Sequence, residues 1–92
     1  MVQVTNYSRF NISVSIPNNL DSDGDESFFD LAPGHTENWN RNPNYTVQVN
    51  VRIEGIDLRF EIGGGDALSI DPTGVAFCNG QRVDPLWVKV FF

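Results

Sequence analysis

The chain is poor in the residues that form disulfides, bind zinc or act in catalysis: its 92 residues include one cysteine, Cys78, and one histidine, His35. A single cysteine cannot form a disulfide within the chain, although secreted domains of this size usually carry several. A zinc site draws most of its ligands from Cys and His, so we do not expect zinc. The low cysteine content predicts a reducing compartment, the cytoplasm, while secretion is not excluded.

The same shortage argues against catalysis. Cys78 and His35 lie far apart in the sequence, and no predicted helix begins near Cys78 to lower the pKa of its thiol. Paired carboxylates for glycosidase chemistry need a cleft, and a domain of this size has little room for a deep one. We therefore predict no catalytic residue and no enzymatic activity.

Basic residues and long apolar runs are also scarce. The chain has six Lys and Arg against twelve Asp and Glu, a formal net charge of −6. A nucleic-acid partner requires a basic surface, so none is expected. No stretch approaches the roughly 20 apolar residues of a membrane-spanning helix, and the opening MVQVTNYSRF has no apolar run of signal-peptide length. Neutral partners, such as a glycan, a lipid headgroup or another protein, stay open.

The sequence does contain long stretches in which apolar and polar residues alternate. FNISVSI at 10–16, YTVQVNVRI at 45–53 and DLRFEI at 57–62 place every second residue on one apolar face, the pattern of a half-buried β-strand. No window of ten residues has the spacing of an amphipathic helix. We predict one all-β domain, residues 1–92, folded as a two-sheet antiparallel β-sandwich. The expected strands are 2–5, 9–16, 27–31, 36–40, 45–53, 57–62, 67–70, 74–78, 81–83 and 86–91.

Turn residues separate these strands. Asn79 and Gly80 both tolerate a positive φ, which predicts a two-residue type I′ hairpin turn. Pro72 and Gly74 fit a type I turn in DPTG at 71–74. Glu54-Gly55 divides two strands expected to form the longest hairpin. The glycines of GGGD at 63–66 suit a corner at which the chain crosses between sheets.

The most acidic part of the chain is NNLDSDGDESFFDLAPGHTENWNR, residues 18–41. Carboxylates at Asp21, Asp23, Asp25 and Asp30 can surround a hard cation when a turn folds them together, so one hypothesis is a calcium site with these four ligands. The EF-hand pattern does not fit, because the twelfth position of such a loop is not acidic and no helix flanks it. The alternative is a hydrated loop whose charges prevent edge-to-edge pairing of sheets.

Trp39 stands in a polar segment with Asn40, Arg41 and, further on, Tyr45. An indole surrounded by amides and a guanidinium is typical of a shallow carbohydrate or headgroup site, since the ring stacks on the C–H face of a sugar and the amides bind hydroxyls. These four residues are the predicted ligand-binding set. The alternative is that Trp39 is an inward core residue and its Asn neighbours only form the turn to the next strand.

The last segment, DPLWVKVFF at 84–92, has large apolar groups on both faces. Either both faces of this strand are covered within the domain, or its outer face, with Trp87 and Phe91, meets another subunit. A sandwich without disulfides gains stability from such a contact. We therefore expect a homo-oligomer formed through residues 86–92.

Three Asn-x-Ser/Thr sequons begin at Asn6, Asn11 and Asn44. Such motifs are acceptors for N-glycosylation when they lie on the surface of a secreted protein. An Asn-rich chain contains about one or two of them by chance, so their use stays open.

The order of motifs in the first part of the chain resembles a known family. In VQVTNYSRFNISVSI at 2–16 a short strand ends in Asn-x-Ser and a second strand follows. After the acidic loop, FFDLAPGHTENWNR at 28–41 has an apolar strand, a Pro-Gly turn and an aromatic strand ending in Arg. Residues 2–41 thereby resemble the opening half of small acidic β-sandwich proteins of the aegerolysin type, and more loosely the actinoporin-like lectins and cytolysins.

This resemblance implies binding to membrane sphingolipids or glycans. The second half of the chain departs from it, because the chain is shorter and lacks the tryptophan- and cysteine-rich segment of the aegerolysins, so no binding residue is carried over. The predicted function is a lectin-like, non-enzymatic binding module for a neutral glycan or lipid headgroup that self-associates. The alternative is a calcium-binding structural or assembly protein that uses the acidic loop.

Overall fold

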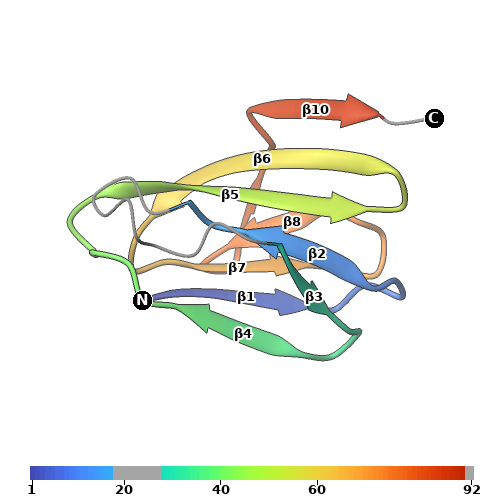
Figure 1. Cartoon of the computed structure of the whole chain (residues 1–92), viewed down its shortest axis with the longest axis horizontal. Helices are drawn as coiled ribbons and strands as arrows, with labels where there is room; N and C mark the ends of the chain where they lie inside the picture. Colours follow the sequence, from blue (N-terminus) through green and yellow to red (C-terminus); the bar gives the residue numbers. More distant parts are fainter. Residues whose placement is uncertain (18–27, 91–92) are drawn as a thin grey trace.

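The computed structural model describes residues 1–17 and 28–90, and its ten strands form two five-stranded sheets that pack face to face (Figure 1). The predicted all-β sandwich is confirmed. No helix among these described residues is long and apolar enough to cross a membrane. The strands are β1 (Val2–Asn6), β2 (Ile12–Ser15), β3 (Phe29–Leu31), β4 (Thr36–Trp39), β5 (Thr46–Ile53), β6 (Ile56–Gly63), β7 (Ala67–Ile70), β8 (Ala76–Cys78), β9 (Gln81–Val83) and β10 (Trp87–Val90).

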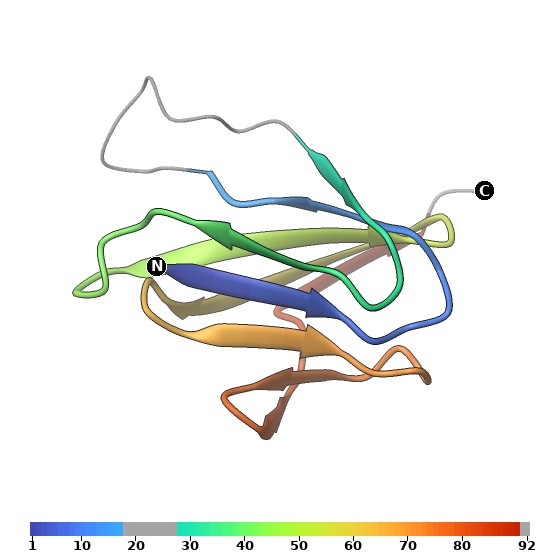
Figure 2. The ribbon, with the colours of Figure 1, turned by 90° about the horizontal axis from the view of Figure 1, so that it is seen from below.

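One sheet has the strand order β4-β1-β7-β8-β9 and the other the order β10-β6-β5-β2-β3. Figure 2, turned by 90°, shows β2 and β3 in one layer and β1, β4 and β7 in the other. Every described pair of strands is antiparallel except β1 and β7, which are parallel. The alternating pattern marks which face of a strand is buried but not the direction of its neighbour, so the sequence did not predict this parallel pair.

The buried faces follow the alternation. Val47, Val49 and Val51 of β5 are buried, and burying each such side chain contributes about 1.5–3 kcal/mol. Two residues predicted to face inward do not: Phe10 is 43% exposed and Tyr45 is 53% exposed. Both precede the first residue of their strands, so the pleat that turns alternate side chains inward has not yet begun at these positions.

Two hairpin turns have a type I′ backbone, which was predicted for Asn79-Gly80 but not for Glu54-Gly55. Asn79 and Gly80, between β8 and β9, have φ angles of 51° and 84°. Glu54 and Gly55, between β5 and β6, have φ angles of 49° and 76°. Positive φ at both central residues is the type I′ geometry, which matches the twist of the flanking strands. The β5–β6 hairpin is the longest, with eight residue pairs.

Residues 63–66 carry the chain from β6 in one sheet to β7 in the other, as predicted. A Cβ atom on Gly64 would lie 2.0 Å from the backbone oxygen of Asn42, so only glycine fits there. The backbone N–H of Gly64 donates to the carbonyl oxygen of Tyr45 over 2.8 Å. This corner therefore anchors the loop that follows β4.

Asn6, the first residue of the first sequon, has a structural role in the fold. Asn6 is fully buried, and its side-chain amide donates to the carbonyl oxygens of Phe10 (2.7 Å) and Leu31 (2.9 Å). Its Oδ1 accepts a hydrogen bond from the backbone N–H of Ser8. In the folded chain this amide is thus inaccessible to a glycosylating enzyme, whereas Asn11 and Asn44 are exposed.

Candidate functional site

A pocket of about 300 Å³ opens at one side of the sandwich, where β3 and β4 are the edge strands of opposite sheets. The chain passes from one sheet to the other here, through the turn at residues 32–35. We name this cavity the edge pocket. Its lining residues are Phe29, Glu37, Asn38, Trp39, Asn40 and Arg41.

The register of β4 points two of these side chains toward the opposite sheet. Trp39 lies opposite Val2 and Glu37 lies opposite Val4 on the neighbouring strand β1. Residues opposite one another in an antiparallel pair share a face, and both valines are fully buried between the sheets. Trp39 and Glu37 therefore lie on the interior face of β4. Trp39 is buried, whereas Glu37 is exposed and its Oε1 accepts a hydrogen bond from the backbone N–H of Asn38 over 3.2 Å.

Phe29 enters the edge pocket from β3. It lies opposite the buried Val14 and so shares the interior face of the other sheet. The ring centroids of Phe29 and Trp39 are 6.3 Å apart with an interplanar angle of 70°, an edge-to-face pair worth about 0.5–1.5 kcal/mol beyond its buried area. Phe29 is 42% exposed and Trp39 only 7%, so Phe29 offers the accessible ring and Trp39 forms a wall backed by the core.

Three of the four predicted ligand-binding residues, Trp39, Asn40 and Arg41, line the edge pocket, and Tyr45 does not. Tyr45 is an exposed side chain in the loop before β5. The structure places Trp39 in the hydrophobic core, as the alternative interpretation proposed. Sequence reasoning missed Phe29 and Glu37; Glu37 was detectable, because it stands two positions before Trp39 and strand residues two apart share a face.

Arg41 is held by backbone carbonyl groups. Its Nη2 donates to the oxygen of Ile16 over 2.5 Å and its Nη1 to the oxygen of Asn40 over 2.8 Å. Ile16 directly follows β2 in one sheet, and Arg41 follows β4 in the other. The guanidinium thus ties the two sheets together at the end of the pocket.

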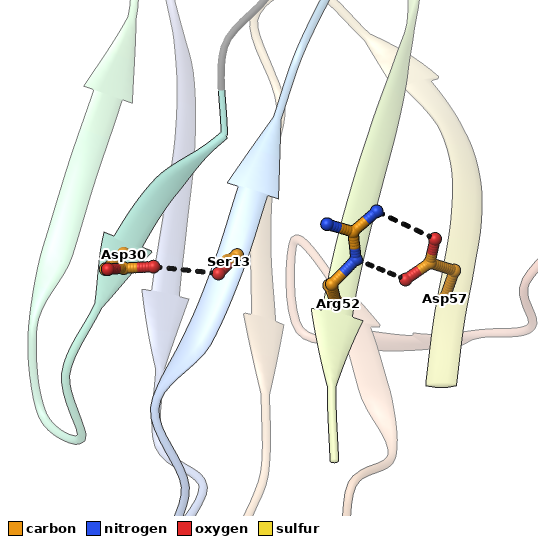
Figure 3. Close-up of polar contacts among 4 residues, drawn as sticks. All are labelled: Ser13, Asp30, Arg52 and Asp57. Atoms are coloured by element: carbon orange, nitrogen blue, oxygen red, sulfur yellow. Dashed lines mark hydrogen bonds and ion pairs between the residues drawn. The ribbon is translucent and has the colours of Figure 1, made fainter. Parts of the chain in front are cut away.

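Of the four predicted calcium ligands, only Asp30 lies within the described residues; Asp21, Asp23 and Asp25 lie outside them. Asp30 is on β3, where its carboxylate accepts a hydrogen bond from the Ser13 hydroxyl over 2.8 Å (Figure 3). In the part of the chain that the structure describes, no three Cys, His, Asp or Glu residues are grouped to hold a metal. The calcium hypothesis therefore stays a prediction.

Asp30 and Ser13 begin a polar row across the outer face of the sheet. Ser13 lies opposite Asp30 on one side and Arg52 on the other, and Arg52 lies opposite Asp57. The Arg52 guanidinium contacts both carboxylate oxygens of Asp57, at 2.8 and 3.2 Å (Figure 3). It also lies 4.3 Å from the ring centroid of Phe28. The charged groups of this row are therefore already paired with one another or with Phe28.

The second tryptophan belongs to the same outer face. Trp87 is 41% exposed, and the guanidinium carbon of Arg59 lies 4.8 Å from its ring centroid. Arg59 Nε donates to Asn50 Oδ1 over 3.1 Å. The combination of indole, guanidinium and amide that the sequence suggested around Trp39 is thus also assembled here. Its residues come from the β5–β6 hairpin and from β10, and strand pairing brings them together.

Cys78 has the surroundings of a structural thiol. It is half-buried on β8, and its Sγ donates to Asp66 Oδ2 over 3.7 Å. Burial, together with the negative charge of Asp66, raises the pKa of the Cys78 thiol. A cysteine nucleophile requires the opposite shift, so this environment does not activate the thiol.

No protein-family model matches the chain, and no match was found among curated proteins or among solved structures. The resemblance of residues 2–41 to the aegerolysins and the actinoporin-like proteins therefore stays a prediction.

Proposed function

We propose that this protein is a non-enzymatic binding module for a neutral sugar, carried by a glycan or by a lipid headgroup, and that the edge pocket is its site. The observation that carries the proposal is that the accessible Phe29 ring and the polar residues Glu37, Asn38 and Asn40 line one cavity. A sugar needs both an apolar surface for its C–H face and polar groups for its hydroxyls.

Each lining group has a role in this proposal. Phe29 supplies the stacking surface, and Glu37 accepts hydrogen bonds from sugar hydroxyls. The Asn amides both donate and accept, which suits hydroxyls that do the same. Trp39 holds the Phe29 ring in place through their edge-to-face contact.

The size of the pocket limits the ligand. About 300 Å³ is at the lower end of the range for small-molecule sites, which favours one or two sugar rings. With few contacts, we expect a dissociation constant on the order of millimolar for the isolated sugar. Self-association, which we also propose, would raise the affinity for a surface that displays many copies of the ligand.

The test is binding to a glycan array and to neutral vesicles that display glycolipids. Phe29→Ala is expected to weaken binding at least tenfold because it removes the stacking surface, and Glu37→Gln is expected to weaken it less. Tyr7→Ala, at an exposed aromatic that does not line the edge pocket, is the matched control and is expected to bind like the parent protein. Normal binding by the Phe29 variant, or loss confined to the Tyr7 variant, would show that the edge pocket is not the site.

Trp39→Ala does not provide this test. Trp39 is 7% exposed and belongs to the core cluster, so its truncation is expected to destabilise the fold by about 3–5 kcal/mol whether or not a ligand binds.

The alternative remains a calcium-binding structural or assembly protein. It relies on Asp30 and on three aspartates outside the described residues. A thermal melt in calcium against one in chelator separates the two proposals, because a ligand bound only to the folded state raises the midpoint.

A further inference from the structure

Three side chains on the outer face of the β10-β6-β5-β2-β3 sheet form a cross-strand row. Trp87 on β10 lies opposite Arg59 on β6, and Arg59 lies opposite Asn50 on β5, strands that are neighbours in the sheet (Figure 1). The guanidinium carbon of Arg59 is 4.8 Å from the centroid of the Trp87 ring, and Arg59 Nε donates to Asn50 Oδ1 over 3.1 Å. These contacts fix the guanidinium between the indole and the amide. We name the three residues the Trp87 row.

The Trp87 row has donor nitrogens that the fold does not use. Among the residues that the structure describes, no acceptor bonds to Nη1 or Nη2 of Arg59, and none bonds to Nδ2 of Asn50. Arg59 and Asn50 are only half-buried, and Trp87 is 41% exposed, so these groups are open to a ligand. A guanidinium stays charged at every physiological pH. The acceptor that complements it best is therefore an anion.

The neighbouring polar row shows which anion suits such a guanidinium. Arg52 lies two residues from Asn50 on β5, on the same face, and its guanidinium also lies over an aromatic ring, 4.3 Å from the centroid of Phe28. Its Nε and Nη2 donate to the two carboxylate oxygens of Asp57 (Figure 3). Arg59 has the same aromatic neighbour but lacks the carboxylate. A carboxylate is thus the group that would complete the second arrangement.

Neither of the two nearest carboxylates on this face of β6 takes that place. Asp57, two residues before Arg59, is held by Arg52. Glu61, two residues after Arg59, is exposed, and no ion pair joins it to Arg59. The charge of Glu61 does weaken the attraction for an anion, so this surface suits a ligand with a single carboxylate rather than one with many.

We propose that the Trp87 row binds a sugar acid, a uronate unit of an otherwise neutral glycan. The two Nη atoms of Arg59 bind the carboxylate, since a guanidinium matches both oxygens of that group. Asn50 Nδ2 donates to a neighbouring hydroxyl, and the exposed part of the Trp87 indole contacts the C–H face of the ring. The row does not line the edge pocket, and the inference does not depend on the function proposed for that pocket.

Two features favour a sugar acid over other anions. The exposed indole beside the donors fits the C–H face of a sugar ring, which an aspartate or glutamate side chain does not have. The formal net charge of −6 repels a polyanion, whereas salt screens a single distant charge within about 10 Å. Because the row is open to solvent and makes few contacts, we expect a dissociation constant on the order of millimolar.

The test is a titration of the full chain with methyl glucuronide, followed by NMR of the indole and guanidinium N–H groups. The signals of Trp87 and Arg59 are expected to shift in a saturable way. Methyl glucoside, which has a hydroxymethyl group in place of the carboxylate, is expected to bind about tenfold more weakly at this row. The indole signal of Trp39, in the wall of the edge pocket, reports separately on that pocket.

Variants assign the binding to the row. Arg59→Gln is expected to weaken glucuronide binding about tenfold, and Arg59→Lys is expected to weaken it less, because it keeps the charge but not the paired nitrogens. Trp87→Ala is expected to weaken it through loss of the ring contact. Arg82→Gln, at an exposed side chain on β9 of the other sheet, removes the same charge and is the matched control with unchanged binding. Melting curves verify that each variant folds, and the exposed Trp87 position keeps the test available if an Arg59 variant does not.

Several outcomes would overturn the proposal. Equal affinity for glucuronide and glucoside at the Trp87 signal would show that the carboxylate is not recognised. Full binding by folded Arg59→Gln or by Trp87→Ala would place the ligand elsewhere, and equal loss in Arg82→Gln would reduce the effect to net charge. Equally tight binding of a blocked aspartate, acetyl-aspartate amide, would assign the row to acidic peptides instead of sugar acids.

Discussion

At the scale of single residues, buried polar groups hold the strand connections together. Asn6 satisfies two carbonyl groups on different segments and also accepts the backbone N–H of Ser8. Its own backbone N–H donates to the oxygen of His35 and its carbonyl accepts from Gly34. One side chain therefore connects β1, the loop before β2 and the end of β3.

Replacing Asn6 by Ala is expected to destabilise the protein by about 1–3 kcal/mol, because the Leu31 carbonyl loses its buried donor and the Phe10 carbonyl keeps only the Ser8 hydroxyl. Urea denaturation monitored by circular dichroism measures this loss. Asn11→Ala is the control, since Asn11 begins another sequon but is exposed, and it is expected to change stability by less than about 0.5 kcal/mol. Equal midpoints for the two variants would contradict the role assigned to Asn6.

At the scale of elements, the hairpins depend on the backbone that their central residues allow. The β8–β9 turn has Asn79 at its first central position, and the β5–β6 turn has Glu54 there, each with a positive φ. Asn tolerates this conformation well and Glu does not. The longest hairpin of the molecule thus contains a local strain that the shorter one avoids.

Glu54→Asn is expected to stabilise the protein by about 0.5–1 kcal/mol, because Asn-Gly is the favoured pair in a type I′ turn. The measurement is the midpoint of urea denaturation, compared between proteins whose free energy of unfolding depends on urea concentration with the same slope. Glu61→Asn, in the same hairpin but within β6, removes the same charge and is expected to give no gain. A Glu54 variant no more stable than the Glu61 variant would show that the turn is not strained.

The bounds of the strands are also decided at this scale. The ten expected strands occur close to their predicted bounds, because alternation and turn residues are local signals. Phe10 and Tyr45 were predicted to face inward but are exposed. Both lie outside the strands, where the backbone is not pleated and alternate side chains need not point to one face.

At the scale of the whole molecule, one carboxylate links distant loops. Asp66 accepts hydrogen bonds from Asn79 Nδ2 over 3.0 Å and from the backbone N–H of Gly63 over 2.8 Å. It thereby connects the β6–β7 corner with the β8–β9 hairpin. These bonds, chiefly the one from Asn79, lower the pKa of the Asp66 carboxyl group.

This shift predicts part of the acid sensitivity of the fold. The pKa of Asp66 is lower in the folded than in the unfolded chain, so its contribution is present above the unfolded pKa and is lost as pH falls through the folded pKa. Asp66→Asn is therefore expected to flatten the dependence of the melting temperature on pH between roughly pH 5 and pH 2.

Asp84→Asn is the control for that series, because it removes the same charge from an exposed side chain. Its melting temperature is expected to keep the acid slope of the parent protein. The same slope in the Asp66 variant would contradict the role of this carboxylate.

The sequence by itself determined the all-β class, the strands, the turns and most of the buried faces. Each of these follows from alternation and turn chemistry within a few neighbouring residues. Only the tertiary structure decided that β1 runs parallel to β7, that Phe29 meets Trp39 in the edge pocket, and that β10 borders its sheet. The physical reason is that strand neighbours are selected by packing between segments far apart in the chain, and a local pattern records which side of a strand is buried but not which strand lies beside it.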